Sequence, residues 1–181
     1  MRLAAKGFHA MVFLAALAAA PPFAWAADGQ GLSELAHRLD VAWVLVAAAL
    51  VLMMQVGFLL LEAGMVRSRN SINVAQKNVL DFVFGVVVFA AVGFMFAFGS
   101  SGFLPVGLDG DLFFLSKLDS WQATFFVFQV MFCGTSATIV SGAVAERMGL
   151  TAYVAGTVAL SAVIYPVFAH WAWGGALGPN Q

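Results

Sequence analysis

Four long apolar runs alternate with short polar segments along most of the chain. The runs contain no Asp, Glu, Lys or Arg, and they cover residues 42–61, 82–99, 121–145 and 150–178. An α-helix needs about 20 such residues to cross the hydrocarbon core of a bilayer. The pattern therefore predicts an all-α membrane protein with four transmembrane helices, at about residues 42–66, 78–99, 121–146 and 150–175.

The beginning of the chain has a different pattern, which is typical of a secretory signal peptide. Arg2 and Lys6 precede a short apolar centre, and an A-x-A cleavage site ends at Ala26. We therefore expect residues 1–26 to be removed, which leaves residues 27–41 as a short external segment before the first membrane helix. The alternative is that this region is retained as an additional helix.

The composition supports a membrane protein and argues against nucleic acid as a partner. Hydrophobic residues make up 62% of the chain and charged residues 9%, whereas a soluble domain carries about 25% charged residues. Without the predicted signal peptide, Lys and Arg fall from 8 to 6 against 9 Asp and Glu, so the mature chain is acidic.

The charges of the loops predict how the chain crosses the membrane. Arg67, Arg69 and Lys77 follow the first apolar run, so the positive-inside rule places this loop in the cytoplasm. The segment 100–120 carries one lysine against three aspartates, which fits the exterior. We therefore expect a multi-pass protein of the cell (inner) membrane with its mature N-terminus outside.

Several charged residues near the cytoplasmic ends have structural explanations. Lys77 and Asp81 are four residues apart and are predicted to pair on one helix. Arg147 is predicted to lie at the negative end of the third helix, where a cation is favoured. Glu62 leaves four interpretations open: it snorkels, caps a neighbouring helix, pairs with a basic residue or takes part in transport.

Small residues dominate the second half of the third apolar run. Gly134, Thr138 and Gly142 recur every four residues and therefore share one helical face. Small residues at this spacing let helices approach closely in lipid, so we expect an oligomer or a larger bundle. Cys133 is the single cysteine, so the chain can form neither an intrachain disulfide nor a cysteine metal cluster. We expect Cys133 to be a packing residue.

Aromatic residues dominate the opposite end of the same run. Phe125, Phe128 and Phe132 share one helical face. Trp171 and Trp173 lie near the end of the fourth run, at the level of the outer interface. Composition alone favours interfacial anchors for the two tryptophans. No enzymatic constellation, cofactor motif or metal-binding pattern is found, so the sequence predicts no enzyme, no cofactor and no metal site.

Three stretches of the chain resemble the ammonium transporter family (the Amt, Mep and Rhesus proteins). They are "GFLLLEAGMVRSRNSINVAQKNVLD" at 57–81, "FVFQVMFCGTSATIVSGAVAER" at 126–147 and "YPVFAHWAWGG" at 165–175. The signal-like start also fits, and the resemblance covers roughly residues 42–178. It implies that residues 42–178 form the N-terminal part of a fold of roughly eleven helices, an inverted repeat in which each subunit of a homotrimer has its own pore.

The resemblance also assigns roles to single residues. Phe128 matches the family's gating phenylalanine, and Trp173, which precedes the glycines, matches its recruiting tryptophan. Both are expected to bind ammonium through cation–π contacts, whereas Trp171 does not match. His170 resembles the histidine that precedes the tryptophan in the family, and we expect it to make a packing hydrogen bond. The family's paired pore histidines and structural aspartate have no matching positions in this chain.

The resemblance implies a transmembrane channel or transporter for ammonium and ammonia. Ammonium would be recruited at the outer vestibule, and an apolar pore would be completed by helices downstream of this chain. The partners implied are ammonium or ammonia, the lipid bilayer, two further copies of the chain and a cytoplasmic regulatory protein of the PII type. Two alternatives stay open: the ammonium-sensing module of a signalling protein, and an inactive truncated product.

Overall fold

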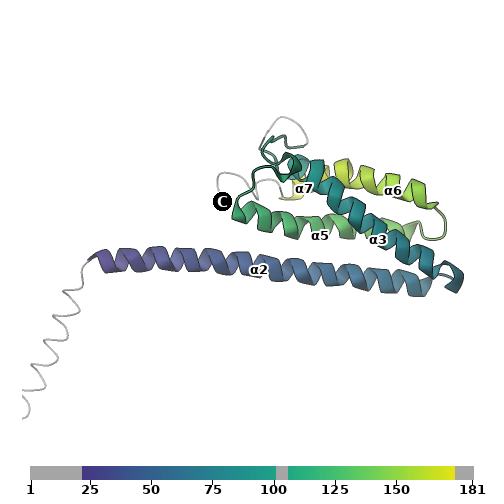
Figure 1. The fold of residues 1–181 in the computed structure, drawn as a ribbon, viewed down its shortest axis with the longest axis horizontal. Helices are drawn as coiled ribbons and strands as arrows, with labels where there is room; N and C mark the ends of the chain where they lie inside the picture. Colours follow the sequence, from purple (N-terminus) through teal and green to yellow (C-terminus); the bar gives the residue numbers. More distant parts are fainter. Residues whose placement is uncertain (1–21, 101–105, 174–181) are drawn as a thin grey trace, which may run out of the picture. The chain divides into compact units, whose positions relative to one another are not determined.

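The computed structural model describes the backbone of residues 22–100 and 106–173, and the side chains of these residues from Gly31 onward. These residues are helical apart from short connections (Figure 1). The helices are α2 (Pro22–Met65), α3 (Ser71–Val88), α4 (Phe94–Phe98), α5 (Ser120–Ala143), α6 (Leu150–Ala159) and α7 (Tyr165–Trp173). Four shorter helical turns join them: η1 (Ser68–Asn70), η2 (Phe89–Gly93), η3 (Phe113–Leu115) and η4 (Leu160–Ile164).

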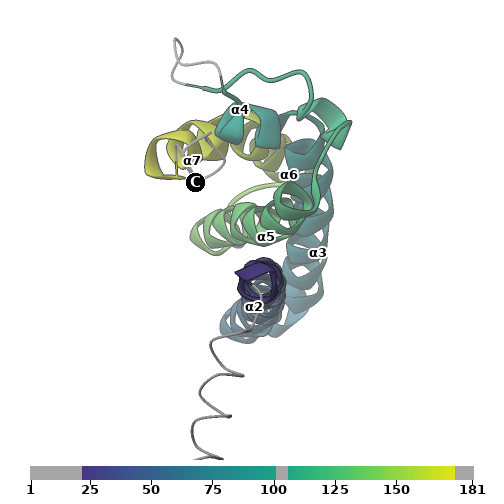
Figure 2. The same ribbon diagram turned by 90° about the vertical axis from the view of Figure 1, so that its left-hand side faces the viewer.

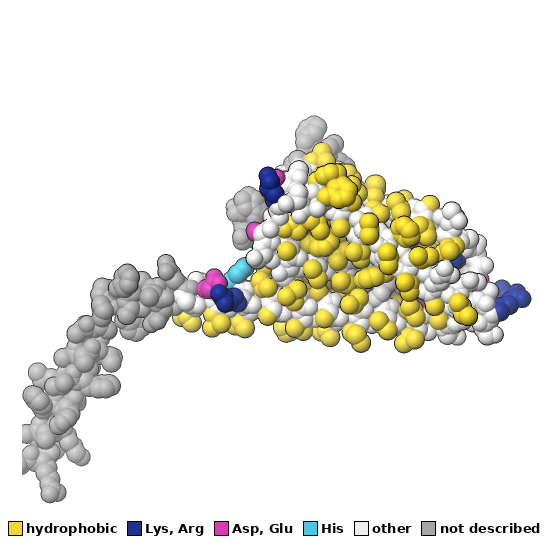
Figure 3. Space-filling model, in the orientation of Figure 1, with side chains coloured by type: hydrophobic (Ala, Val, Ile, Leu, Met, Phe, Trp, Pro, Cys, Tyr) yellow, Lys and Arg dark blue, Asp and Glu magenta, His cyan; other side chains and the backbone are white. Residues whose placement is uncertain are grey.

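Four helical segments are long and apolar enough to cross a membrane, which confirms the predicted fold class. They are Gly31–Met65, Ser68–Phe98, Ser120–Ala143 and Leu150–Trp173. The face drawn in Figure 3 is mostly hydrophobic, as expected for a surface in contact with lipid or further helices. The protein is therefore a membrane protein. The predicted signal peptide stays a prediction, because residues 1–21 lie outside the described part of the chain.

The first two helices begin earlier than the hydrophobic pattern predicts. Helix α2 begins at Pro22 and α3 at Ser71, whereas the apolar runs place these starts at about residues 42 and 78. The polar sequence before the first run is rich in helix formers, and Glu34 accepts a hydrogen bond from Arg38 one turn later at 2.9 Å. A polar segment of this kind extends a helix beyond its apolar run, and the prediction was based on the apolar run alone.

Residues 1–42 and 43–181 form two separate compact units. The described part of the first unit is the polar beginning of α2. Within the second unit, α3 packs against both α5 and α6, and α4 packs against α7, as Figure 2 shows. The remainder of α2 is joined to α3 and α5 by side-chain hydrogen bonds. The two short loops, 66–70 and 144–149, lie at the same end of this unit (Figure 1).

Aromatic side chains fill the core near the opposite end of the unit. Phe89, Phe94, Phe98 and Phe125 are buried, and Cys133 packs among them with no exposed surface. Ring pairs such as Phe98 and Phe125, with centroids 5.0 Å apart and planes at 82°, adopt the edge-to-face geometry that aromatic rings favour. The role of Cys133 as a small packing residue is thereby confirmed.

The second and fourth membrane spans each contain one wide π-helical turn, and the two turns meet. In η2 the N–H of Phe94 bonds to the carbonyl of Phe89, and in η4 the N–H of Tyr165 bonds to that of Leu160. Gly93 lies at the contact: a Cβ atom there would come within 2.5 Å of the carbonyl oxygen of Ser161. The close approach of the two spans therefore requires a residue without a side chain.

Glu146 joins the two short loops. Its carboxylate accepts hydrogen bonds from Asn70 Nδ2 at 2.7 Å and from Arg67 Nε at 3.3 Å. Its backbone adopts a positive φ of 60°, which non-glycine residues rarely do. The hydrogen bond from Asn70, followed by that from Arg67, lowers the pKa of Glu146. Arg147, whose expected role was at the end of the third helix, is exposed in the same loop.

We expect Gly93→Ala to destabilise the protein by about 1–3 kcal/mol, because the new methyl group would overlap the backbone of η4. Thermal unfolding of the purified protein in detergent measures the effect. Gly156→Ala on α6 is the matched control, since nothing lies within 4 Å of a Cβ atom there. Equal unfolding temperatures for the two variants would contradict the close contact at Gly93.

We expect Glu146→Gln to lower the unfolding temperature at neutral pH and to have progressively less effect in acid. A folded-state pKa below the ordinary value of 4.5 means that the ionised carboxylate stabilises the fold above that pH. This stability is lost as the pH falls through the folded-state pKa. Melting curves of both proteins across this range measure the difference. Glu34→Gln, which removes an exposed pair within α2, is the control and should have a small effect. A constant difference at all pH values would exclude the charge as the cause.

Candidate functional site

The structure brings Phe128 and Trp173, the two predicted site residues, into contact. Phe128 comes from the first half of α5 and Trp173 is the last residue of α7. Their ring centroids are 6.4 Å apart and their planes lie at 83°. In this edge-to-face arrangement, the ring that contributes its edge keeps both of its faces uncovered by the partner. Trp173 is 41% exposed, so its indole is accessible within the described part of the chain.

Phe128 lies between the other two rings on its face of α5. Its centroid is 4.9 Å from that of Phe132 and 6.5 Å from that of Phe125. The three rings are therefore contiguous, but they differ in burial. Phe125 is only 6% exposed and belongs to the aromatic core, whereas Phe128 lies at the margin of that core. Phe125 therefore has a packing role, although it shares its helical face with Phe128.

His170 positions the end of α7 that carries Trp173. Its Nδ1 atom lies 2.9 Å from the carbonyl oxygen of Ala97 at the end of α4. Because a carbonyl oxygen only accepts, Nδ1 is the protonated nitrogen of this ring. The expected packing hydrogen bond of His170 is therefore confirmed. Trp171 is 71% exposed. Trp173, two residues later, is 41% exposed and contacts Phe128.

One polar pair behind Phe128 was missed by the sequence analysis. Tyr165, the first residue of α7, donates a hydrogen bond from its hydroxyl group to Gln129 Oε1 at 3.2 Å. Gln129 has no exposed surface. This bond ties α7 to α5 one residue away from Phe128. The available signal was a glutamine in the middle of an apolar helix, where a polar side chain requires a partner from another helix.

The structure shows which side chains hydrogen-bond to Glu62. Glu62 is 8% exposed, and its Oε2 atom accepts hydrogen bonds from Asn78 Nδ2 at 2.9 Å and from Ser141 Oγ at 3.0 Å. Neither donor is basic, so the expected alternative of an ion pair is wrong. The carboxylate instead links α2 to α3 and α5 through neutral donors.

The predicted pair between Lys77 and Asp81 is wrong as well. Lys77 donates from Nζ to the carbonyl oxygen of Met148 at 2.5 Å and lies 5.7 Å from the ring centroid of Tyr153. Asp81 accepts hydrogen bonds from Tyr153 and Thr138. The second short loop and α6 thus provide closer partners than the next turn of α3, and spacing along one helix does not reveal partners of this kind.

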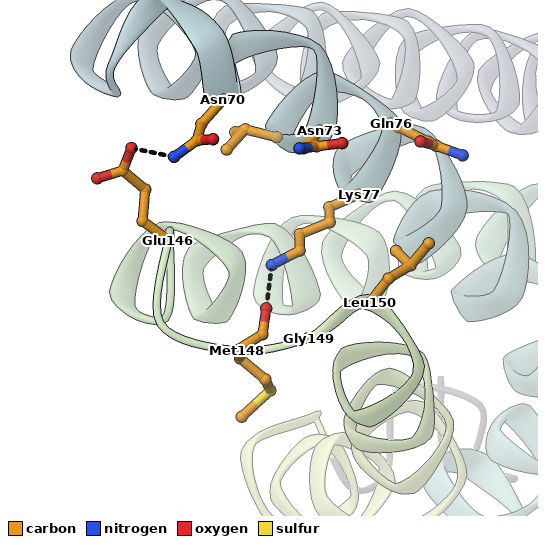
Figure 4. Close-up of a pocket in the computed structure, with 9 residues that line it drawn as sticks. Asn70, Asn73, Gln76, Lys77, Glu146, Met148, Gly149 and Leu150 are labelled. Carbon is orange, nitrogen blue, oxygen red and sulfur yellow. Dashed lines mark hydrogen bonds between the residues drawn. The ribbon is translucent and has the colours of Figure 1, made fainter.

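A polar recess of about 340 Å³ lies between the start of α3 and the second short loop. Figure 4 shows Glu146 and Asn70 meeting on one side of it and Lys77 reaching Met148 across it. Asn73 and Gln76 also line the recess. Because the ammonium group of Lys77 is held by a backbone carbonyl, the recess is a polar junction between the loops. Three or more His, Cys, Asp or Glu side chains do not gather into a metal site in the described residues.

Comparison with known proteins identifies the family. Residues 42–180 match the model of the Ammonium Transporter Family. The chain is 40% identical over 158 residues to the ammonium transporter Amt2 of Archaeoglobus fulgidus, which covers 82% of the chain and 33% of the relative. It is 37% identical over 158 residues to ammonium transporter 1 member 3 of Solanum lycopersicum, which covers 85% of the chain and 34% of the relative.

A solved structure shares the fold. The structure named Sensor Amt Protein superposes with a TM-score of 0.74 at 42% sequence identity, over 80% of this chain and 36% of that chain. The chain therefore spans about a third of the length of the proteins that it matches. With the family model covering most of its length and two such relatives above 35% identity, the chain belongs to the ammonium transporter family.

Proposed function

We propose that this chain forms the N-terminal part of a channel or transporter that conducts ammonium or ammonia across the cell (inner) membrane. The observation that supports the proposal is the contact between Phe128 and Trp173, two aromatic rings from different spans at the end of the bundle away from the short loops. In this proposal Trp173 recruits ammonium and Phe128 gates the entrance to the pore.

The chemistry of aromatic rings explains recruitment. A cation is attracted to the negative face of an indole or phenyl ring by about 0.5–1 kcal/mol at an exposed position and about 2 kcal/mol when it is desolvated. Trp173 is partly exposed and contacts Phe128, so a cation bound to an uncovered ring face of this pair would lose part of its hydration. The pair is therefore suited to weak, reversible binding of a small cation.

Recruitment alone does not explain passage through the membrane. A charge at the bilayer centre costs at least about 2.5–3.5 kcal/mol on insertion scales, which exceeds the cation–π attraction. Ammonium, unlike potassium, can lose a proton and continue as a neutral amine. The apolar side chains of the spans are compatible with such a neutral species. The groups that accept the proton and the remainder of the pore would come from helices downstream of this chain.

The same proposal includes an orientation and an assembly. The basic residues of the first short loop favour a cytoplasmic position for that end, with the mature N-terminus and the Phe128–Trp173 pair on the outer side. Many large hydrophobic side chains are exposed on the described spans, for example Val83, Val87 and Phe168. We propose that further helices of the full-length protein and two neighbouring subunits cover part of them, and that a PII-type protein binds on the cytoplasmic side.

A second candidate function is ammonium sensing. It is favoured by the likeness to the structure named Sensor Amt Protein, at 42% identity. A sensor would need the recruitment site but not a high flux. The coding sequence downstream of Gln181 and the ammonium flux of the full-length protein distinguish the two functions: further membrane helices with rapid flux indicate transport, and a cytoplasmic output domain whose activity follows ammonium indicates sensing.

We expect Trp173→Leu in the full-length protein to raise the ammonium concentration for half-maximal transport about 5- to 30-fold, which corresponds to a loss of about 1–2 kcal/mol of cation–π attraction. Concentration-dependent currents or uptake in proteoliposomes measure the change. Trp171→Leu is the matched control, because Trp171 is 71% exposed and is expected to leave this concentration unchanged. An equal effect of both substitutions would reject the role of Trp173 in recruitment.

We expect Phe128→Ala to change the ammonium conductance and to open a leak for other small cations, because the ring between Phe132 and Trp173 would be missing. Currents in ammonium, sodium and potassium solutions measure selectivity. Phe168→Ala removes a ring that is 65% exposed on α7 and serves as the control. Unchanged conductance together with unchanged selectivity would exclude Phe128 as a gate.

A further inference from the structure

Two carboxylates are buried together at the end of the unit that carries the short loops. Asp81 on α3 has no exposed surface, and Glu62 on α2 is 8% exposed. We refer to these two residues and the side chains that hydrogen-bond to them as the carboxylate cluster. The cluster lies far from the aromatic pair: Thr138, one of its members, is ten residues along α5 from Phe128, which is about 15 Å at 1.5 Å per residue.

Neutral donors from three helices hold the two carboxylates. Asp81 Oδ2 accepts a hydrogen bond from the hydroxyl group of Tyr153 on α6. The hydroxyl group of Thr138 on α5 lies 3.4 Å from the same oxygen atom and shares its single proton with the carbonyl oxygen of Gly134, which is 3.2 Å away. Glu62 Oε2 accepts those from Asn78 and Ser141. Each carboxylate therefore has both of its donors on one oxygen atom, and none of these donors carries a charge.

The charges of the cluster do not balance when both acids are ionised. Lys77 is the one buried cation among the described residues, and its ammonium group is bonded to the carbonyl oxygen of Met148. The titratable groups nearest to Asp81 are Tyr153 from α6 and Glu62 from α2, while α5 contributes only hydroxyl groups. Lys77, from α3 itself, lies over the ring of Tyr153. Two negative charges and one positive charge leave a net charge of −1 in an apolar region, where an unbalanced charge is costly.

The cluster and its neighbour Gln55 also contain hydrogen-bond acceptors that lack a donor. Three buried acceptor atoms have no partner: Asp81 Oδ1, Asn78 Oδ1 and Gln55 Oε1. Gln55 adjoins the cluster, because its amide group donates to Thr138. Each of the three residues is at most 8% exposed. The cluster therefore has more acceptors than donors, and buried polar atoms of this kind usually have a partner.

We propose that the carboxylate cluster is a proton-binding site that holds one proton on Asp81. A single proton on Oδ1, the oxygen atom without a donor, removes the excess negative charge. A water molecule would supply donors but would leave the charge in place. A divalent metal ion lacks ligands, since no three His, Cys, Asp or Glu side chains lie together in the described part of the chain.

The two acids are not equivalent, which explains why the proton belongs to Asp81. Glu62 lines a groove of about 250 Å³ between α2 and α5, so its side chain is nearer to the surface. Asp81 has no exposed surface and its second oxygen has no donor. Ionising Asp81 would therefore place a second negative charge between α2, α3, α5 and α6. The protonation of this residue is coupled to the packing of these four helices, independently of ammonium recruitment at the other end.

Infrared spectroscopy tests the proposal, because a protonated carboxyl group has a C=O stretching band well separated from the carboxylate bands. The full-length protein is reconstituted in lipid at neutral pH, and its spectrum is compared with that of Asp81→Asn. We expect the difference spectrum to contain one carboxylic acid band that is absent from the variant. The asparagine side chain resembles a neutral aspartic acid in shape and is expected to preserve the fold. Asp111→Asn, at an exposed position in the segment between α4 and α5, is the control and should leave the band unchanged.

A second variant keeps the test decisive if Asp81→Asn does not fold. Tyr153→Phe keeps the carboxyl group but removes a hydroxyl donor from Oδ2. We expect it to shift the same band to higher frequency without removing it. A wild-type protein with no carboxylic acid band at neutral pH, or a band that neither variant changes, would overturn the proposal. Because the measurement does not involve ammonium, its failure would leave the proposed transport function untouched.

Discussion

Within the hydrocarbon core of a bilayer no water is available to a polar side chain, so each polar group of these spans needs a partner on another helix. Such partners are found between the described helices at both ends of the second unit. Tyr165 and Gln129 join α7 to α5, and His170 joins α7 to α4. Glu62 joins α2 to α3 and α5 at the other end. Polar pairs thus act together with close packing in placing the apolar helices, since in lipid no hydrophobic effect drives helices together.

At the two ends of the second unit, different kinds of contact hold the helices together. Aromatic rings and small packing residues fill one end, where Phe128 and Trp173 meet. Carboxylates, amides and hydroxyl groups fill the other, next to the two short loops that Glu146 connects. The first kind of contact suits capture of a cation at an accessible ring face, and the second suits retention of a proton in a closed site. The proposed recruitment and the proposed proton site are therefore separate in this chain, and each has its own experimental test.

The sequence predicts the four spans well because a run of uncharged residues is a direct consequence of burial in lipid. The motif around Phe128 and the tryptophan before the glycines predict residues that the structure indeed brings together. Spacing along one helix was a poor guide to charged partners: Lys77 and Asp81 bind groups of α6 and of the second short loop instead of one another. Helix starts were also misplaced, because hydropathy marks the lipid boundary and not the end of the hydrogen-bonded backbone.

The wide turn η4 has a consequence for the direction in which the last helix points its side chains. A π turn accommodates one more residue than an α turn, and one residue corresponds to a rotation of about 100° around a helix axis. Without that extra residue, the face of α7 that carries His170 and Trp173 would turn away from Ala97 and Phe128. A single codon inserted or deleted within η4 is thus enough to rotate the indole out of register with its phenyl partner, with no change in either aromatic residue.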